Sequence, residues 1–295
     1  GSAQQEWFAL IEAEKANFAI AKMCRWAGVS ESGFYAWRRK PASATLRRRE
    51  ELEVEVRRVF EESNSIYGYR KIAAQLDKEH IVVCERTVAG IMSDLGLESC
   101  HPAPWRYLTM ADGSQVSQDL IGRDFTATEP GVRFVGDITQ IDTWEGPLYL
   151  STMIDLFSRE VVGYAMDDNY AAGLVCATVE MAFNNGRVRR GGIFHSDHGS
   201  QYTSGAFRLC LAEAGMVGSM GVVGSCFDNA CAESWFATLK KELVHRTVFP
   251  TRKKAVAAVT NFIEVWYNRR RLHSVLGYET PASVRERYEQ QFNAA

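Results

Sequence analysis

Long apolar stretches are missing from this sequence. No run of apolar residues approaches the roughly 20 that a helix needs to cross the hydrocarbon core of a bilayer, and no basic segment followed by an apolar one opens the chain. We therefore expect a soluble, cytoplasmic protein that does not enter a membrane.

Cysteine pairs and two common catalytic motifs are also missing. The seven cysteines are scattered, odd in number and never spaced as paired CxxC ligands, so neither a disulfide framework nor a zinc knuckle is supported. The HExxH motif of zinc enzymes and the GxSxG elbow of α/β-hydrolases do not occur. Zinc chemistry and Ser-His-Asp hydrolysis are therefore poorly supported, even though His195 and His198 flank an aspartate.

The chain has no excess of basic residues, and its formal net charge is −2. The charges are nevertheless unevenly distributed: residues 1–110 carry 16 basic and 15 acidic side chains, residues 111–233 carry 7 and 16, and residues 234–295 carry 11 and 5. Basic flanks around an acidic centre fit a protein that grips phosphate at its edges and holds a divalent metal in its middle. The alternative is that each basic cluster is only solvated surface.

Two helical modules are predicted in the first third of the chain. Residues 17–39 show two short helical stretches, separated at Gly28 and with Ser30 placed to cap the second. Three more amphipathic segments follow between residues 46 and 96, where Gly96 ends the last. The pattern is that of the helix-turn-helix, whose second helix can enter a major groove. One such pair is often plain core, but two in tandem favour DNA binding.

After a stretch without periodicity, from Ser99 to Pro130, the pattern changes to α/β. The predicted strands are Arg133–Ile141, Pro147–Leu156, Glu160–Met166, Gly192–Asp197 and Met216–Met220, and the predicted helices are Ala171–Phe183, Ser204–Ala214, Asp228–Val244 and Thr251–Tyr267. Three hairpin-connected strands followed by alternating helix and strand predict a mixed sheet with helices packed against it.

Three acids lie on three different predicted elements. Asp137 is embedded in one apolar run, Asp197 ends another, and Glu233 lies on a helix. Mg²⁺ prefers oxygen ligands and keeps several waters, so a few carboxylates suffice to hold it. Two such ions roughly 4 Å apart can stabilise both the attacking and the leaving oxygen in phosphodiester cleavage. We therefore predict that the three acids are catalytic and bind two Mg²⁺ ions, with Mn²⁺ as a substitute, although each acid alone is more often a surface carboxylate.

The residues predicted to contact DNA are mostly cationic and lie on segments expected at the surface. Lys240 is seven residues after Glu233, on nearly the same side of the helix, and is expected near the scissile phosphate. The full set is Arg38, Arg39, Lys40, Arg47, Arg48, Arg49, Arg70, Lys71, Arg86, Thr87, His195, Lys240, Arg269, Arg270 and Arg271.

Four features together resemble the DDE transposases of the insertion-sequence-3 group, over about residues 17 to 285. They are the three acids, with 35 residues between Asp197 and Glu233, and the segments HSDHGSQYTS, GSCFDNACAESWFATLKKEL and WYNRRRLHSVLGYETP. The resemblance implies a ribonuclease-H-like catalytic domain similar to retroviral integrase. It also implies Mg²⁺-dependent nicking at terminal inverted repeats, followed by attack of the freed 3′-hydroxyl on target DNA.

The chain departs from the family pattern at two places. Gln140 stands where members often carry tyrosine, and Val222-Val223 stands where they often carry a basic residue. Leucine heptads are also missing, so the chain resembles the downstream part of a longer enzyme. The resemblance therefore implies an upstream helix-turn-helix and leucine-zipper product as a fused or associated partner.

We thus expect a multidomain DNA transposase that integrates an insertion sequence and associates with the bacterial nucleoid when bound to DNA. The predicted domains are helix-turn-helix modules at residues 1–45 and 46–98, a linker at 99–130, a ribonuclease-H-like catalytic domain at 131–246 and a basic helical extension at 247–295. Double-stranded DNA, both element ends and target, is the expected partner, bound by a homodimer or a larger assembly. Two alternatives stay open: a DNA-binding regulator without catalysis, and a nuclease of the same fold that does not join strands.

Overall fold

The computed structural model describes residues 3–39, 43–100, 120, 124–220 and 230–293 of the chain. Contacts between residues divide the chain into two compact units, and the boundary in the sequence falls between Arg58 and Val59. Within the described ranges, no helix combines the length and the apolar composition that crossing a membrane requires.

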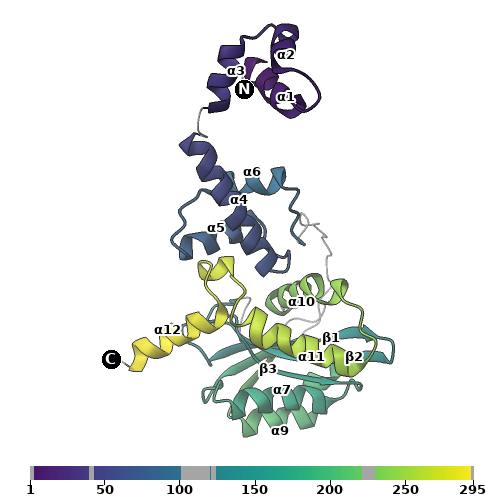
Figure 1. The fold of residues 1–295 in the computed structure, drawn as a ribbon. Coiled ribbons are helices and arrows are strands. Elements are labelled where there is room, and N and C mark those ends of the chain that lie inside the picture. Colours follow the sequence, from purple (N-terminus) through teal and green to yellow (C-terminus); the bar gives the residue numbers. More distant parts are fainter. Residues whose placement is uncertain (1–2, 40–42, 101–119, 121–123, 221–229, 294–295) are drawn as a thin grey trace, which may run out of the picture. The chain divides into compact units, whose positions relative to one another are not determined.

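The first unit is helical. It contains α1 (Ala3–Glu14), α2 (Ile20–Ala27), α3 (Glu31–Arg39) and the beginning of α4 (Ala44–Glu62) (Figure 1). The predicted break is present, because Gly28 adopts φ 67° and ends α2, and Ser30 Oγ accepts a hydrogen bond from the Gly33 amide at 3.1 Å. The two-helix prediction was incomplete, since α1 also packs into this core through Phe8 and Ile11.

The second unit opens with the end of α4 and the helices α5 (Tyr69–Lys78) and α6 (Glu85–Asp94). Ile72 and Leu76 of α5, and Val88 and Ile91 of α6, are fully buried. Gly96 has φ 63° just beyond α6, as its predicted role at the helix end requires.

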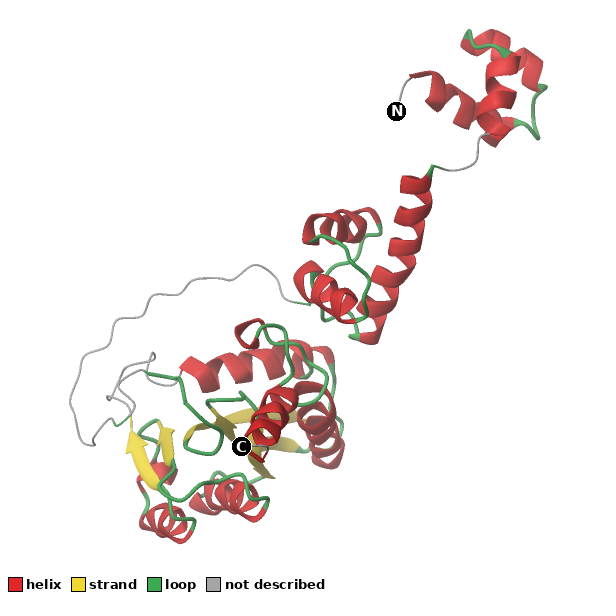
Figure 2. Cartoon of the chain, turned by 90° about the vertical axis from the view of Figure 1, so that its left-hand side faces the viewer, coloured by secondary structure: helices red, strands yellow, loops and turns green. Residues whose placement is uncertain are grey.

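A five-stranded mixed sheet forms the centre of the second unit (Figure 2). Its strands are β1 (Arg133–Thr143), β2 (Gly146–Asp155), β3 (Val161–Asp167), β4 (Ile193–Ser196) and β5 (Val217–Met220), in the order β3-β2-β1-β4-β5. The pairs β1–β2 and β2–β3 are antiparallel, while β1–β4 and β4–β5 are parallel. The predicted mixed sheet is therefore confirmed.

Helices cover both faces of the sheet (Figure 1). One face packs against α7 (Ala172–Asn184), α8 (Ser200–Thr203) and α9 (Gly205–Glu213), and the other against α10 (Ala230–Glu242) and α11 (Arg252–Asn261). On the first face, the Phe194 ring crosses directly over Gly136, where an added Cβ would lie 2.1 Å from a ring carbon. Glycine is therefore required at this point of β1.

The C-terminal segment returns to the sheet and fastens to its β3 edge. After α11, a π-helical turn (Phe262–Tyr267) leads to Asn268, whose side chain exchanges two hydrogen bonds of 3.0 Å with the backbone of Val161. Two short 3-10 turns, Val244–Arg246 and Ser274–Leu276, complete this region.

A last helix, α12 (Pro281–Asn293), was not predicted. It begins with a proline at its first position, and the side chains of Thr280 and Ser283 cap its N-terminus. Arg285 then pairs with the buried Glu160 at 2.7 Å, which fixes the helix to the turn between β2 and β3.

Candidate active site

Neighbouring parallel strands bring Asp137 and Asp197 together. Val135 pairs with His195 between β1 and β4, so Asp137 and Asp197, each two residues further on, occupy matching positions. Backbone amides orient both carboxylates: the Ile138 amide donates to Asp137 Oδ1 at 2.7 Å, and the Gly199 amide donates to Asp197 Oδ1 at 2.9 Å.

Glu233 approaches the same place from α10. Val135 and Ile141 of β1 share a hydrophobic core with α10, and Asp137 lies on that face because alternate residues of a strand point the same way. Glu233 follows the fully buried Ala232 and is itself exposed. Its carboxylate therefore lies at the rim of the interface between α10 and the sheet.

The pKa of Asp137 responds to the other charged groups of this region. Burial raises the pKa of Asp137 from 3.8 to about 6, against the lowering effect of the Ile138 amide, and the negative charges of Asp197 and Glu233 raise it further while Lys240 lowers it. Negative charge at one place resists further ionisation unless a cation is present. The site thus suits a cation better than it suits three free carboxylates.

The described residues do not form a ready-made metal cage. Among them, no three His, Cys, Asp or Glu side chains come close enough together to hold an ion. The donor set still fits Mg²⁺ or Mn²⁺, since carboxylate oxygens are the ligands that these hard cations prefer. Asp228 and Asn229, the first two residues of the helix predicted over Asp228–Val244, lie outside the described residues.

The far end of α10 is held by a buried ion pair. The side chain of Glu242 is fully buried and accepts hydrogen bonds from Arg271 Nη2 at 2.7 Å and from Trp266 Nε1 at 3.0 Å. This network ties α10 to the C-terminal segment. It therefore helps to set where Glu233 and Lys240 stand relative to β1.

Two predicted DNA contacts need correction. His195 is 1% exposed, and its Nδ1 lies 2.9 Å from Ser219 Oγ on β5. Arg271 is 8% exposed and is occupied by Glu242. Neither side chain lies on the open surface, because His195 is buried against Ser219 of β5, and Arg271 lines a cavity where it balances the buried charge of Glu242.

The other predicted DNA contacts differ in exposure. Lys40 lies outside the described residues; Arg49, Lys71, Thr87 and Lys240 are partly buried; and the exposed ones are Arg38, Arg39, Arg47, Arg48, Arg70, Arg86, Arg269 and Arg270. Several of them pair with nearby acids, for example Arg38 with Glu12 at 3.4 Å. DNA would have to replace such exposed pairs, which contribute little stability.

Tyr170 is a residue near the site that the sequence did not single out. Its ring packs against Tyr149 at 5.2 Å, and it is 48% exposed. Burial first, and then the charges of Asp197 and Asp137, raise the pKa of its phenol. No sequence motif marks Tyr170, because its place near the carboxylates depends on the turn that follows β3.

Comparison with known families gives three matches along the chain. Residues 47–103 match the family described as "HTH-like domain", and residues 127–226 and 215–281 match two descriptions of the "Integrase core domain". The helical module and the sheet with α10 thus each have counterparts elsewhere.

Two relatives span nearly the whole chain. It is 36% identical to the transposase InsF of insertion sequence IS3A from Escherichia coli K12, over 93% of this chain and 96% of the relative. It is 34% identical to an uncharacterized 31 kDa protein of insertion element IS600 from Shigella sonnei, over 91% and 99%.

Solved structures resemble the chain more distantly. A simian T-cell lymphotropic virus intasome in complex with a PP2A regulatory subunit has a chain that is 13% identical, with a TM-score of 0.46 over 77% of this chain and 73% of its own. The HTLV-2 integrase catalytic core domain in complex with magnesium gives 13% identity and a TM-score of 0.42, over 54% and 98%.

Proposed function

The chain belongs to the insertion-sequence-3 group of DDE transposases, and from this premise we propose that Asp137, Asp197 and Glu233 are its catalytic acids. The single observation that carries the assignment is the pairing of Val135 with His195, which gives Asp137 and Asp197 matching positions along two neighbouring parallel strands. The charges of Asp197 and Glu233, which raise the pKa of Asp137, support it. A DNA transposase needs such a cluster to hold divalent metal.

The proposed chemistry is nicking at the element ends, followed by attack of the freed 3′-hydroxyl on target DNA. Two Mg²⁺ ions, when bound, would supply Lewis-acid stabilisation of the attacking and leaving oxygens. The residues of the chain do the rest. Asp137 and Asp197 are held by backbone amides on a rigid sheet, Glu233 arrives on an anchored helix, and Lys240 offsets negative charge at the phosphate.

DNA recognition is assigned to the helical modules and the basic tail. We assign modules to residues 1–45 and 46–98, a linker to 99–130, catalysis to 131–246 and a basic extension to 247–295. Support comes from the HTH-like match and from exposed cations, including Arg86 on α6 and Arg269 and Arg270 after the π-helical turn. Two ends must meet during transposition, so we expect a homodimer or a larger assembly on DNA, fused to or associated with an upstream product.

Replacing Asp197 with asparagine tests the catalytic assignment. D197N keeps the size and the hydrogen bonding of the side chain but removes its charge. We expect Mg²⁺-dependent nicking and joining to fall by at least about a thousand-fold, while binding of an element end changes less than about two-fold. The assay is a gel that resolves nicked and joined products of a labelled element end.

The matched control is Asp142→Asn, on the exposed part of the same β1 strand as Asp137. D142N should keep full activity. Strand transfer by D197N at the wild-type rate would refute the assignment. A separate substrate with a preformed 3′-hydroxyl end distinguishes a transposase, which joins it, from a nuclease, which does not. Absence of both nicking and joining from the wild-type protein would favour a DNA-binding regulator.

A further inference from the structure

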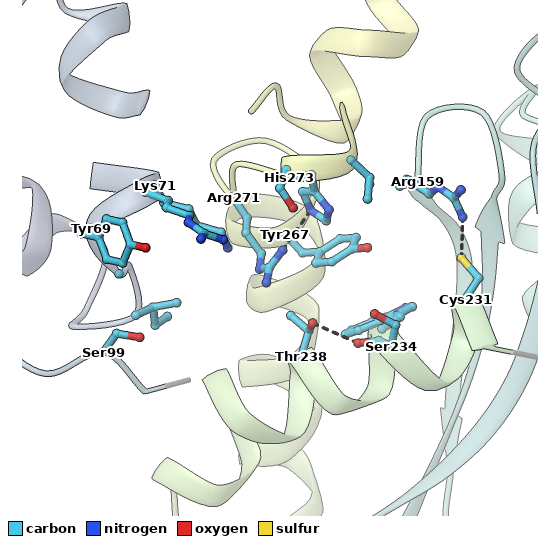
Figure 3. Close-up of a pocket in the computed structure, with 16 residues that line it drawn as sticks. Tyr69, Lys71, Ser99, Arg159, Cys231, Ser234, Thr238, Tyr267, Arg271 and His273 are labelled. Carbon is cyan, nitrogen blue, oxygen red and sulfur yellow. Dashed lines mark hydrogen bonds between the residues drawn. The ribbon is translucent and has the colours of Figure 1, made fainter. Parts of the chain in front are cut away.

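A cavity of about 920 Å³ lies in the second unit, apart from the three acids. Its walls come from α5, from α10 and from the C-terminal segment after the π-helical turn (Figure 3). In Figure 3, Lys71 and Arg271 extend toward one space, with Thr238 and Ser234 of α10 along its side. Among the described residues, no aspartate or glutamate lines this cavity, so its lining does not suit a metal ion.

The lining carries four cations, of which Arg271 pairs with Glu242 and Arg70 with Glu85, while Lys71 and Arg159 pair with no described acid. Lys71 lies over the Tyr67 ring at 5.2 Å and forms no ion pair with any described carboxylate. Arg159 donates to Cys231 Sγ and to the Phe125 carbonyl, both at 2.9 Å, and both of these partners are uncharged. Burial lowers the pKa of Lys71 to about 8, and the Arg271 cation acts in the same direction. Burial of these cations therefore costs free energy, and a bound anion would offset that cost.

The lining also offers an unused donor. Trp235 is 2% exposed, and its Nε1 has no hydrogen-bond partner in the described part of the chain. The Trp235 ring stacks on Tyr267 at 5.0 Å and 19°, so the indole is firmly placed. A buried N–H without an acceptor is uncommon in folded proteins. An acceptor atom from a ligand would satisfy it.

The cavity and the acids lie on different flanks of α10. A helix turns by about 100° per residue, so Ser234 lies about 100° and Thr238 about 140° around the helix axis from Glu233. A strand that contacts both flanks would be held across the catalytic helix. The volume exceeds that of a single phosphate and suits one or a few nucleotides.

We propose that this cavity binds the phosphate backbone of a DNA strand through Lys71, Arg159 and Trp235. The ligand is a strand and not a free anion, because the lining holds aromatic rings as well as cations, the two kinds of side chain that grooves for single strands combine. The proposal rests on the proposed function for the identity of the nucleic acid. It adds a second phosphate-contacting surface that is separate from the metal-binding acids.

The test compares two lysines of one helix. Lys71→Gln removes a cation from the cavity, whereas Lys78→Gln removes one from the exposed last turn of α5. Affinity for a labelled element end is measured by fluorescence anisotropy at several salt concentrations. We expect K71Q to bind about ten-fold more weakly and to lower the salt slope by about one, while K78Q stays within about two-fold of wild type.

A further variant removes a donor without removing charge. Trp235→Phe keeps an aromatic ring but loses the N–H. It should weaken binding by about three- to ten-fold, with thermal unfolding used to confirm folding. Equal affinities for K71Q, W235F and wild-type protein would overturn the proposal.

Competitors identify the ligand. A short single-stranded oligonucleotide should displace the labelled end from wild type more effectively than from K71Q. Inorganic phosphate and poly-glutamate are tested in the same way. If one of them displaces the labelled end more effectively from wild type than from K71Q, and the oligonucleotide does not, the cavity is a site for a free anion or an acidic peptide, and the DNA assignment is rejected. D197N should lose nicking while it keeps its affinity for the element end, so a failure of the three-acid assignment is distinct from a failure of this proposal.

Discussion

At the scale of single residues, Asp137 links the fold to the chemistry. The side chain is partly buried between β1 and α10, near two other carboxylates, and its pKa is raised from 3.8 to about 6. Between these two pH values the folded chain keeps a proton that the unfolded chain has lost. The free energy of unfolding therefore falls as pH rises through this window and stays reduced above about pH 6.

Asp137→Asn should accordingly stabilise the metal-free protein at pH 7, by about 1–3 kcal/mol, because the ionised carboxylate is no longer buried. Denaturant unfolding at pH 7 and at pH 4 measures the effect, which should shrink at the lower pH. Mn²⁺ should raise the melting temperature of wild type above about pH 6, and progressively less below it. A metal-induced shift that persists in D137N, or that does not depend on pH, would contradict this role.

Arg271 and Arg270 are adjacent in sequence but should respond differently to mutation. Arg271→Ala leaves Glu242 buried without its partner, which should destabilise the protein by about 3–5 kcal/mol. Arg270→Ala removes an exposed cation, so stability should stay within about 0.5 kcal/mol and only DNA affinity should fall. Unfolding curves and DNA titrations of both variants separate the two roles. An unchanged stability of R271A would show that the ion pair does not anchor α10.

At the scale of elements, the approach of Phe194 to Gly136 sets how closely β4 packs beside β1. Gly136→Ala would place a methyl group inside the phenyl ring, so either the ring or the strand must move. We expect a loss of about 2–4 kcal/mol and, because Asp137 is the next residue, a loss of metal-dependent activity. Gly90→Ala on α6 is the control: an added Cβ meets no atom within 4 Å, and stability should rise by about 0.5–1 kcal/mol.

Denaturation midpoints of the two alanine variants test this contrast. A Gly136 variant as stable as wild type would mean that β1 and β4 can separate without cost. In that case the matched positions of Asp137 and Asp197 would not be fixed by the sheet.

Elements with strong apolar patterns could be predicted from the sequence, and those with weak patterns could not. β1 and α10 were placed to within a few residues, because Val135 and Ile141 alternate and Ala232, Phe236 and Leu239 form a stripe. α1 buries only Phe8 and Ile11, too few to produce a clear period. α12 was missed as well, although a proline after a threonine indicates a helix start.

The site was predicted in part for a similar reason. Acids within apolar runs indicate a functional position, so Asp137 and Asp197 could be proposed from the sequence, and the spacing along the predicted helix indicated Glu233 and Lys240 as further candidates. Burial of single polar residues depends on tertiary partners that lie far away in sequence. His195 needs Ser219, and Arg271 needs Glu242, so their structural roles could not be predicted.

At the scale of the whole molecule, the two kinds of charge have separate places. Acids outnumber cations in residues 111–233, while cations outnumber acids in residues 234–295 and cluster around Arg38 and Arg47. DNA contacts at several basic surfaces would bring a phosphodiester toward acids that would otherwise repel it. Metal and DNA are thus expected to bind cooperatively, since bound metal reduces the negative charge that repels DNA, and the DNA phosphate adds negative charge that attracts the metal.

The central claim is that the three acids share divalent metal, and a structure of the protein with an element end and Mn²⁺ tests it most directly. Anomalous scattering locates manganese independently of the refined protein atoms. We predict manganese within about 2.2 Å of carboxylate oxygens of Asp137 and Asp197, with Glu233 drawn in to complete the set. Manganese bound elsewhere, or a site that excludes any one of the three acids while the same preparation joins DNA strands, would contradict the account.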